Sequence, residues 1–200
     1  MTIALLSTTY FGPVQWYQKL YRHDHILIEL HETFPKQTYR NRCLIATTQG
    51  IQALTVPVSF GESKQIRDVL ISDHGNWRHL HWQALQSAYG ESPFFEFYED
   101  DLRPFFTEHN WERLFDYNEA IRQKMCQLLD IQPHTVYTEE YVRQQDNDFR
   151  EAITPKHPIP DSDFQPRRYY QVYQQKHGFL PNLSILDLLF NMGPESIFYL

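Results

Sequence analysis

The first thirty residues alternate short apolar runs with breaks that predict a strand, a helix and a second strand. Thr2–Thr8 is an apolar run of the length of a buried strand, and Gly12-Pro13 ends it. Pro13 suits the first turn of a helix through Val14–Leu20. Ile26–Leu30 has the pattern of a second strand. A strand, a helix and a strand in this order open a βαβ unit, so we expect the two strands to pair in parallel.

The next segments carry the pattern of a hairpin. Tyr39–Thr47 and Ile51–Val58 are both strand-like, and they flank a short turn that contains Gly50. Ile66–Ser72 alternates apolar and polar residues, which predicts one further strand. These segments extend the β-structure of the N-terminal half beyond the βαβ start.

The apolar period becomes helical in the second half of the chain. The spacing predicts helices that begin at Trp77, at Pro93 and near Asn110. A last short helix is expected over Ser184–Met192, where Ser184 and Asp187 have the spacing of a capping box. The C-terminal half is therefore predicted to be mainly helical.

Together these elements predict an α/β fold in a single domain that spans residues 1–200. We expect a mixed β-sheet of about five strands packed with helices, a βαβ-like start and a helical C-terminal half. Residues 139–168 differ in character, because they hold several prolines, many charges and few large apolar side chains. We interpret this segment as a Pro-rich, charged surface excursion.

The composition narrows the class of partner. The chain has 200 residues, a hydrophobic fraction of 42% and a formal net charge of −7, which is typical of a folded globular protein and argues against binding to nucleic acid or to an anionic membrane. No apolar run approaches the roughly 20 residues of a membrane-spanning helix, and the N-terminus lacks the basic region of a signal peptide. Cys43 and Cys126 lie far apart without metal-ligand spacing, so we expect free thiols and a cytoplasmic location.

The stretch HETFPKQTYRNRC, residues 31–43, concentrates positive charge in an acidic chain. If it leads into an extended strand, Arg40 and Arg42 lie on one face about 7 Å apart and can grip a phosphate or carboxylate. His31 and Lys36 lie upstream on the connecting loop. The alternative is that both arginines pair with internal carboxylates and hold the loop in place. The residues alone leave both interpretations open.

The ten histidines form no recognisable metal motif, because the sequence contains neither HExxH nor paired His and Cys ligands. It also lacks a Gly-rich phosphate loop, so we expect neither a metal site nor a cofactor. His81 falls on the apolar face of its predicted helix, which favours a hydrogen-bonded core histidine. Asn191 extends the polar stripe of Ser184 and Asp187 on the last helix, and capping does not account for it.

Five segments, in their order along the chain, resemble the WbqC-like protein family. They are YFGPVQWY, KQTYRNRC, LTVPV, SAYGESPFFEFYEDDL and PNLSILDLLFNMGP, and the resemblance covers about residues 4–130 and 169–195. Family members are encoded among genes for surface polysaccharides such as O-antigen. The resemblance implies that the family's motif residues are Tyr10, Phe11, Arg40, Asn41, Arg42, Leu183, Ser184, Asp187, Asn191 and Gly193. Longer members carry another stretch where this chain has its Pro-rich excursion.

The resemblance implies a small transferase in sugar or surface-polysaccharide metabolism of the O-antigen type, which binds an anionic activated substrate at an arginine pair. On this hypothesis the catalytic candidates are Asp187 and His31, as general acid or base. The substrate-binding candidates are Arg40, Arg42, Lys36, Tyr10, Asn41 and Asn191. The alternative is a non-catalytic ligand-binding or assembly protein of the same pathway, which the shortened middle region favours.

Overall fold

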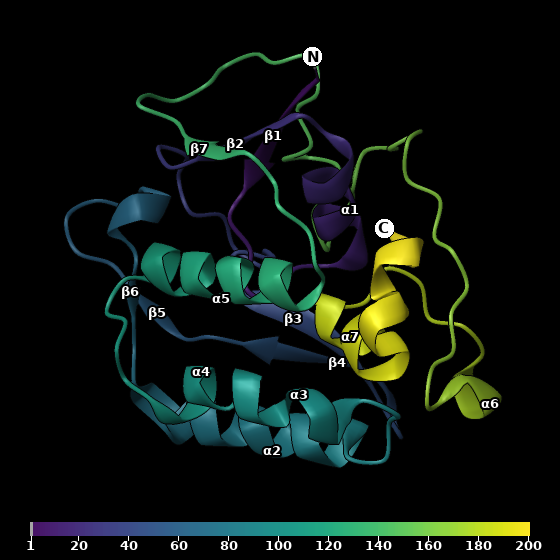
Figure 1. The fold of residues 1–200 in the computed structure, drawn as a ribbon. Coiled ribbons are helices and arrows are strands. Elements are labelled where there is room, and N and C mark those ends of the chain that lie inside the picture. Colours follow the sequence, from purple (N-terminus) through teal and green to yellow (C-terminus); the bar gives the residue numbers. More distant parts are fainter. Residues whose placement is uncertain (1) are drawn as a thin grey trace.

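The computed structural model describes residues 2–200, and its N-terminal part is a parallel sheet (Figure 1). β1 (Ile3–Ser7) leads into helix α1 (Val14–Arg22), and β2 (His25–Glu29) returns beside β1 in parallel. β7 (Thr135–Tyr137) pairs with the other edge of β2, also in parallel. Pro13 occupies the N-cap position, one residue before the first turn of α1, and its side chain makes no capping hydrogen bond. The predicted βαβ start is therefore confirmed.

The second edge of β1 is covered by a segment from far along the chain. The Leu5 N–H donates to the Asn147 carbonyl at 2.9 Å, and the Phe149 N–H donates to the Leu5 carbonyl at 3.0 Å. β1 therefore lies inside the sheet. The chain adds β2 and β7 on one side of β1 and then crosses to the other side, so the order of the strands reverses at β1.

The predicted hairpin is formed by β3 (Arg42–Thr47) and β4 (Gly50–Thr55), which pair in antiparallel fashion. Gly50 closes the turn with a φ of +109°, a conformation that favours glycine. The prediction that the first strand begins at Tyr39 is wrong. The Tyr39 carbonyl instead accepts the backbone N–H of Tyr10 at 2.9 Å, and the chain turns before β3 begins.

A second antiparallel pair is formed by β5 (Val58–Ser59) and β6 (Leu70–Ile71). The strand predicted over Ile66–Ser72 is thus only partly present, because Ile66–Asp68 forms a 3-10 turn before β6. Within residues 2–200 the strands form one parallel sheet and two antiparallel pairs. Together with the helices, this arrangement confirms the predicted mixed α/β class.

Helices cover the hairpin and are the main regular elements of the C-terminal half, as predicted, although residues 138–173 form no helix. Figure 1 shows α5 on one side of the β3–β4 hairpin and α2 with α3 on the other. α5 begins at Leu114 rather than near Asn110, because the Leu114 N–H donates to the Val69 carbonyl at 2.9 Å and holds the preceding residues beside β6. The α-helices after α1 are α2 (Trp77–Tyr89), α3 (Phe95–Leu102), α4 (Pro104–Thr107), α5 (Leu114–Leu128), α6 (Gln174–His177) and α7 (Ile185–Met192), and the 3-10 helices are Ile66–Asp68, His74–Asn76 and Gly193–Tyr199.

Aromatic rings fill the core below the turn that joins β1 to α1. Tyr10 stacks on Tyr117 with the ring centres 5.9 Å apart, and Phe11 stacks on Phe106 at 5.7 Å. All four side chains are buried. Offset and stacked aromatic pairs stabilise a core beyond the area that they bury. The turn is therefore a core element that fixes the end of β1 against α4 and α5.

The Pro-rich segment, residues 139–168, is anchored to α1 by a buried ion pair. Lys19 Nζ lies 2.7 Å from Asp161 Oδ2, and the two side chains are 1% and 5% exposed. Gln15 Nε2 donates to the same oxygen at 2.8 Å, and the ammonium lies 4.3 Å from the centre of the Phe149 ring. Burial opposes the ionisation of Asp161, but the contacts with Lys19 and Gln15 outweigh it and lower the pKa of its carboxyl.

Replacing Asp161 with alanine should release residues 154–168 from α1, because Lys19 loses its buried partner. Trypsin should then cleave after Lys156 about tenfold faster than in the wild type, since each ~1.4 kcal/mol of local stability changes the open population tenfold. Cleavage after Arg122, inside α5, is the internal reference for global unfolding. Asp163→Ala, at an exposed neighbouring carboxylate, should cleave like the wild type. Equal rates of cleavage after Lys156 in Asp161→Ala and Asp163→Ala would contradict the anchoring role of Asp161.

Candidate functional site

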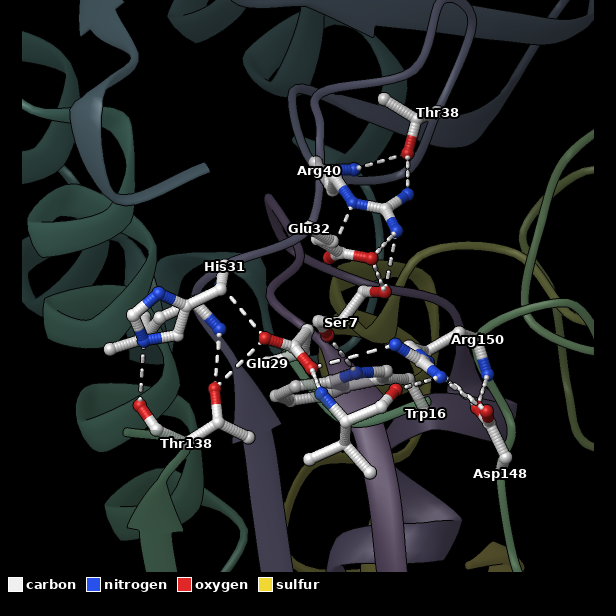
Figure 2. Close-up of polar contacts among 12 residues, drawn as sticks. Ser7, Trp16, Glu29, His31, Glu32, Thr38, Arg40, Thr138, Asp148 and Arg150 are labelled. Atoms are coloured by element: carbon white, nitrogen blue, oxygen red, sulfur yellow. Dashed lines mark hydrogen bonds and ion pairs between the residues drawn. The ribbon is translucent and has the colours of Figure 1, made fainter. Parts of the chain in front are cut away.

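The carboxyl ends of β1 and β2 meet at one edge of the parallel sheet, where Ser7 and Glu29 pair in register. Open α/β sheets bind ligands outside the carboxyl ends of their strands, at the point where the strand order reverses. β1 is such a point, because β2 and Asn147–Phe149 flank it on opposite sides. Figure 2 shows polar side chains converging here from the strand ends, from the loop after β2 and from the segments after β7. This edge is the candidate site.

A buried ion pair between Arg40 and Glu32 lies at this edge. Arg40 Nε donates to Glu32 Oε1 at 2.8 Å, and Nη2 donates to Oε2 at 2.5 Å. The remaining Arg40 donors reach Ser7 Oγ and Thr38 Oγ1, each at 2.6 Å. The two charged side chains are 10% and 9% exposed. Internal oxygens thus occupy the Arg40 guanidinium, as the alternative interpretation of the basic stretch expected.

A second buried carboxylate, Glu29, lies beside this pair and holds three segments together. Glu29 Oε1 accepts the His31 backbone N–H at 2.8 Å and the Thr138 hydroxyl at 2.9 Å, and Oε2 accepts the Val142 N–H at 2.9 Å. Arg150 Nη1 lies 3.5 Å from Oε2, and its guanidinium also pairs with Asp148 (Figure 2). Because Glu29 is fully buried, these donors satisfy a charge that is otherwise costly to desolvate.

The imidazole of His31 is held at the rim of this cluster. Its Nε2 lies 3.2 Å from the Thr138 carbonyl. A carbonyl can only accept, so Nε2 carries the proton and Nδ1 is the basic nitrogen. Within residues 2–200, Nδ1 has no hydrogen-bond partner, and the side chain is half-buried. His31 therefore presents a free acceptor nitrogen in an orientation that Glu29 and Thr138 determine.

Arg42 and Lys36 are the basic residues of the stretch whose donors remain available. Arg42 is the first residue of β3 and is half-buried, and its Nε donates to Thr55 Oγ1 at 3.0 Å. Its two terminal nitrogens bond to no other group in the described part of the chain. Lys36 is exposed on the loop before β3. Arg40 precedes the strand, so the predicted sharing of one strand face by Arg40 and Arg42 is wrong.

Asn41 and Tyr10, two predicted substrate contacts, have internal partners. Asn41 is buried, and its Nδ2 donates to the Val56 carbonyl at 2.8 Å, which fixes the turn before β3 to the residues after β4. Tyr10 is fully buried, and its hydroxyl lies 2.8 Å from His81 Nδ1. The geometry thus gives both side chains packing and hydrogen-bonding roles in the core.

Asp187 is enclosed between α7 and two other segments. Its carboxylate accepts hydrogen bonds from Tyr89 (2.8 Å), Tyr169 (2.7 Å) and Gln171 (2.9 Å), and it is fully buried. Burial raises the pKa of Asp187, although these three hydrogen bonds act in the opposite direction. No arginine is among its hydrogen-bond partners in residues 2–200. The carboxylate of Asp187 is therefore enclosed in the core and is not bonded to Arg40 or Arg42 within these residues.

Asn191 and Ser184 complete the polar stripe of α7. Asn191 Nδ2 donates to the Asp187 carbonyl at 2.7 Å, and its Oδ1 accepts the Val172 N–H at 3.1 Å. The bond from Val172 accounts for the polar side chain of Asn191, which capping does not explain, because it ties residues 169–172 to α7. Ser184 Oγ accepts the Leu186 N–H at 3.3 Å, so Ser184 is the N-cap as predicted. The predicted capping box with Asp187 is not formed, because the Ser184 N–H donates to the Leu44 carbonyl at 2.8 Å.

His81 should make stability fall on acidification. Burial lowers its pKa to about 4, while a hydrogen bond to the Thr55 backbone acts in the opposite direction. The unfolded chain binds a proton near pH 6.5, so the native state is favoured above that pH and loses this advantage as pH falls towards 4. The slope should reach about 1.4 kcal/mol per pH unit. Urea unfolding at several pH values measures it.

His81→Gln is the matching variant, because its amide can still accept from Tyr10 but does not titrate. It should flatten the stability profile between pH 4 and 6.5. His79→Gln, at an exposed position of the same helix, should retain the wild-type slope. Parallel profiles for the wild type and His81→Gln would refute the assignment.

Several residues of the site were missed by sequence reasoning. Glu29 carries a usable signal, because an acidic residue at the end of an apolar strand is poorly placed unless it is paired. Glu32 lies in the loop that follows and lacks this signal. Arg150 and Thr138 carry no such signal. They reach the site only because β7 pairs with β2 and residues 147–149 pair with β1.

No group of three or more His, Cys, Asp or Glu side chains in residues 2–200 is arranged to hold a metal ion. The described helices include none with the length and apolar character required to cross a bilayer.

The fold and the site describe an α/β protein with a polar cluster at the carboxyl edge of a small parallel sheet. The model of the WbqC-like protein family matches residues 8–156 and 161–199, so the chain belongs to this family. It is 29% identical over 224 aligned positions to the uncharacterised protein Rv1507c of Mycobacterium tuberculosis, and the match covers 99% of this chain and 96% of that protein. No solved structure matches the chain.

Proposed function

We propose that the protein is a small transferase of sugar or surface-polysaccharide metabolism, with His31 as its general base. The observation that carries this proposal is the position of the imidazole, whose Nε2 lies 3.2 Å from the Thr138 carbonyl and whose Nδ1 is free within the described residues. A neutral imidazole nitrogen can take a proton from a hydroxyl or amine nucleophile near neutral pH. Family membership supports the choice of pathway through the family's occurrence among surface-polysaccharide genes.

In this proposal the activated substrate carries a phosphate or carboxylate, and Arg42 and Lys36 bind it. Both side chains have donors that bond to no group among residues 2–200. Arg40 is a positioning residue, because it clamps Glu32, the neighbour of His31, to the end of β1. The free thiols of Cys43 and Cys126 support a cytoplasmic location, where cysteines usually remain reduced.

The second candidate function is a non-catalytic ligand-binding or assembly protein of the same pathway. It is favoured because the buried acidic side chains already accept hydrogen bonds from groups of the protein itself. Glu29, Glu32 and Asp187 all accept hydrogen bonds from internal donors, so none of them is free to pair with His31 as a general acid. A transferase therefore relies on His31 alone, or on a group of the substrate.

The decisive experiment combines binding and turnover with UDP-glucose, acetyl-CoA and inorganic phosphate as probes. A ligand at a hundredfold excess over Kd stabilises the fold by about 2.7 kcal/mol, which a thermal shift detects. Either UDP-glucose or acetyl-CoA, the group donor of the reaction, should raise the melting temperature of the wild type and of His31→Gln equally. The same compound should leave the melting temperature of Arg42→Met unchanged. Slow hydrolysis of that donor should occur in the wild type and be lost in His31→Gln.

The controls are His134→Gln and Arg103→Met, which alter an exposed histidine and an exposed arginine outside the site. Both should bind and turn over donor like the wild type. Binding without turnover in the wild type would favour the assembly protein. Stabilisation of Arg42→Met to the wild-type extent would remove the anion site from the proposal.

A further inference from the structure

A cavity of about 350 Å³ lies between the β5–β6 pair, the start of α2 and the residues that precede α5. It shares no lining residue with the carboxyl edge of the parallel sheet. Its wall combines the apolar side chains Leu70, Ile71 and Trp111 with charged groups. The Trp111 ring is fixed by stacking on Phe105, with ring centres 5.4 Å apart and planes at 18°. The volume is at the lower end of the ~300–1,000 Å³ typical of small-molecule sites.

Arg78, from the first turn of α2, is the buried charge of this cavity. It is 6% exposed, and its guanidinium carbon lies 4.4 Å from the centre of the Trp77 ring. Nη1 pairs with Asp73, but Nε is buried without a partner, and Nη2 bonds to no group in residues 2–200. Buried donors are normally satisfied. A guanidinium with spare donors in a cavity wall is suited to bind a carboxylate.

The rim of the same cavity carries two acidic residues, Asp73 and Glu112, and one histidine, His109, and all three are exposed. His109 Nδ1 lies 3.8 Å from Asp73 Oδ1, so the histidine is on the side of Asp73. The hydrogen bond from Arg78 lowers the pKa of Asp73, so this carboxylate is ionised at neutral pH. Asp73 is already paired with Arg78, whereas Glu112 makes no ion pair within the described residues. Glu112 is thus the group that is available to a ligand cation.

We infer that this cavity binds a free α-amino acid with an apolar side chain. The ligand carboxylate accepts from Arg78, its ammonium lies against Glu112, and its side chain packs against Trp111 and Leu70. A simple anion is disfavoured because two carboxylates surround the single guanidinium, and a simple cation is disfavoured because Arg78 repels it. A zwitterion satisfies both signs of charge. This inference does not depend on the proposed transfer reaction.

Isothermal titration of the full chain with L-phenylalanine and its two truncated analogues tests the inference. 3-Phenylpropanoate lacks the ammonium, and phenethylamine lacks the carboxylate. L-Phenylalanine should bind, and each analogue should bind at least about tenfold more weakly, since each loses one charge-assisted contact. No binding of L-phenylalanine or L-leucine at millimolar concentration would overturn the inference, as would equal binding of either analogue.

Glu112→Gln and Glu108→Gln form a matched pair of variants, because Glu108 is an exposed neighbour that does not line the cavity. Glu112→Gln should weaken L-phenylalanine about tenfold and should not weaken 3-phenylpropanoate. Glu108→Gln should change neither. Identical behaviour of the two variants would overturn the inference. The pair decides the question even where substitutions of the buried Arg78 prevent folding.

Discussion

Asp187→Ala is expected to lower the free energy of unfolding by about 4 kcal/mol, because it leaves three buried donors without an acceptor. Tyr89, Tyr169 and Gln171 all donate to this one carboxylate. Tyr89 in addition accepts the backbone N–H of Ala46 at 3.1 Å, so the loss extends to β3. Equilibrium unfolding in urea, followed by circular dichroism, measures the effect.

Asp187→Asn separates charge from shape and should cost about half as much, because one amide oxygen can still accept. The pKa of Asp187 also determines how the stability difference between wild type and Asp187→Asn changes with pH. The folded pKa of Asp187 is raised, so its stabilising contribution is complete at low pH and is lost as pH rises through the folded pKa. The difference between wild type and Asp187→Asn should therefore shrink as pH rises. An Asp187→Ala variant with wild-type stability would instead make Asp187 a functional residue.

Arg40→Met and Arg42→Met are expected to differ sharply in their free energy of unfolding, although only Asn41 separates the two residues in the sequence. Arg40→Met should lower the free energy of unfolding by about 4 kcal/mol, because it leaves Glu32 charged and buried without its partner. Arg42→Met should cost less than about 1 kcal/mol, since Arg42 is half-buried and its guanidinium bonds only to Thr55 Oγ1 among the described residues. Urea unfolding of the two variants measures the contrast.

The double variant Glu32→Gln with Arg40→Met tests the mechanism of this loss. Removing both charges should recover at least half of the stability, because no uncompensated buried charge remains. Ser7→Ala, which removes one Arg40 acceptor at the end of β1, should cost about 1 kcal/mol. If Arg40→Met and Arg42→Met were equally stable and both lost anion binding, the arginine pair would be the ligand site first expected from the sequence.

The βαβ start and the helix from Trp77 were predictable because their signals are local. An apolar run, a Gly-Pro break and a helical apolar period each depend on residues that lie close together in the sequence. The cap at Ser184 belongs to the same class. Boundaries failed where distant partners decide them. β3 begins late because Tyr10 takes the Tyr39 carbonyl, and α5 begins late because Val69 takes the Leu114 N–H.

The polar residues of the candidate site were only partly predictable for the same reason. The sequence marked Arg40 and Asp187 as unusual, and both proved to be buried. It could not assign their partners, because Asp187 bonds to Tyr89 from another helix and Arg40 bonds to Ser7 at the end of β1. His31 became a candidate because its loop position and its chemistry are both visible in the sequence, and its role stays a prediction.

The late pairing of residues 147–149 with β1 has a consequence for how the chain acquires its fold. β1 is synthesised first, but its second edge stays open until Asn147 and Phe149 have left the ribosome. Such non-local pairing slows folding, and an unpaired apolar strand is a template for association with other chains. Nascent chains that end before Asn147 should therefore need protection by chaperones, and the closure of this edge should be among the last steps of folding.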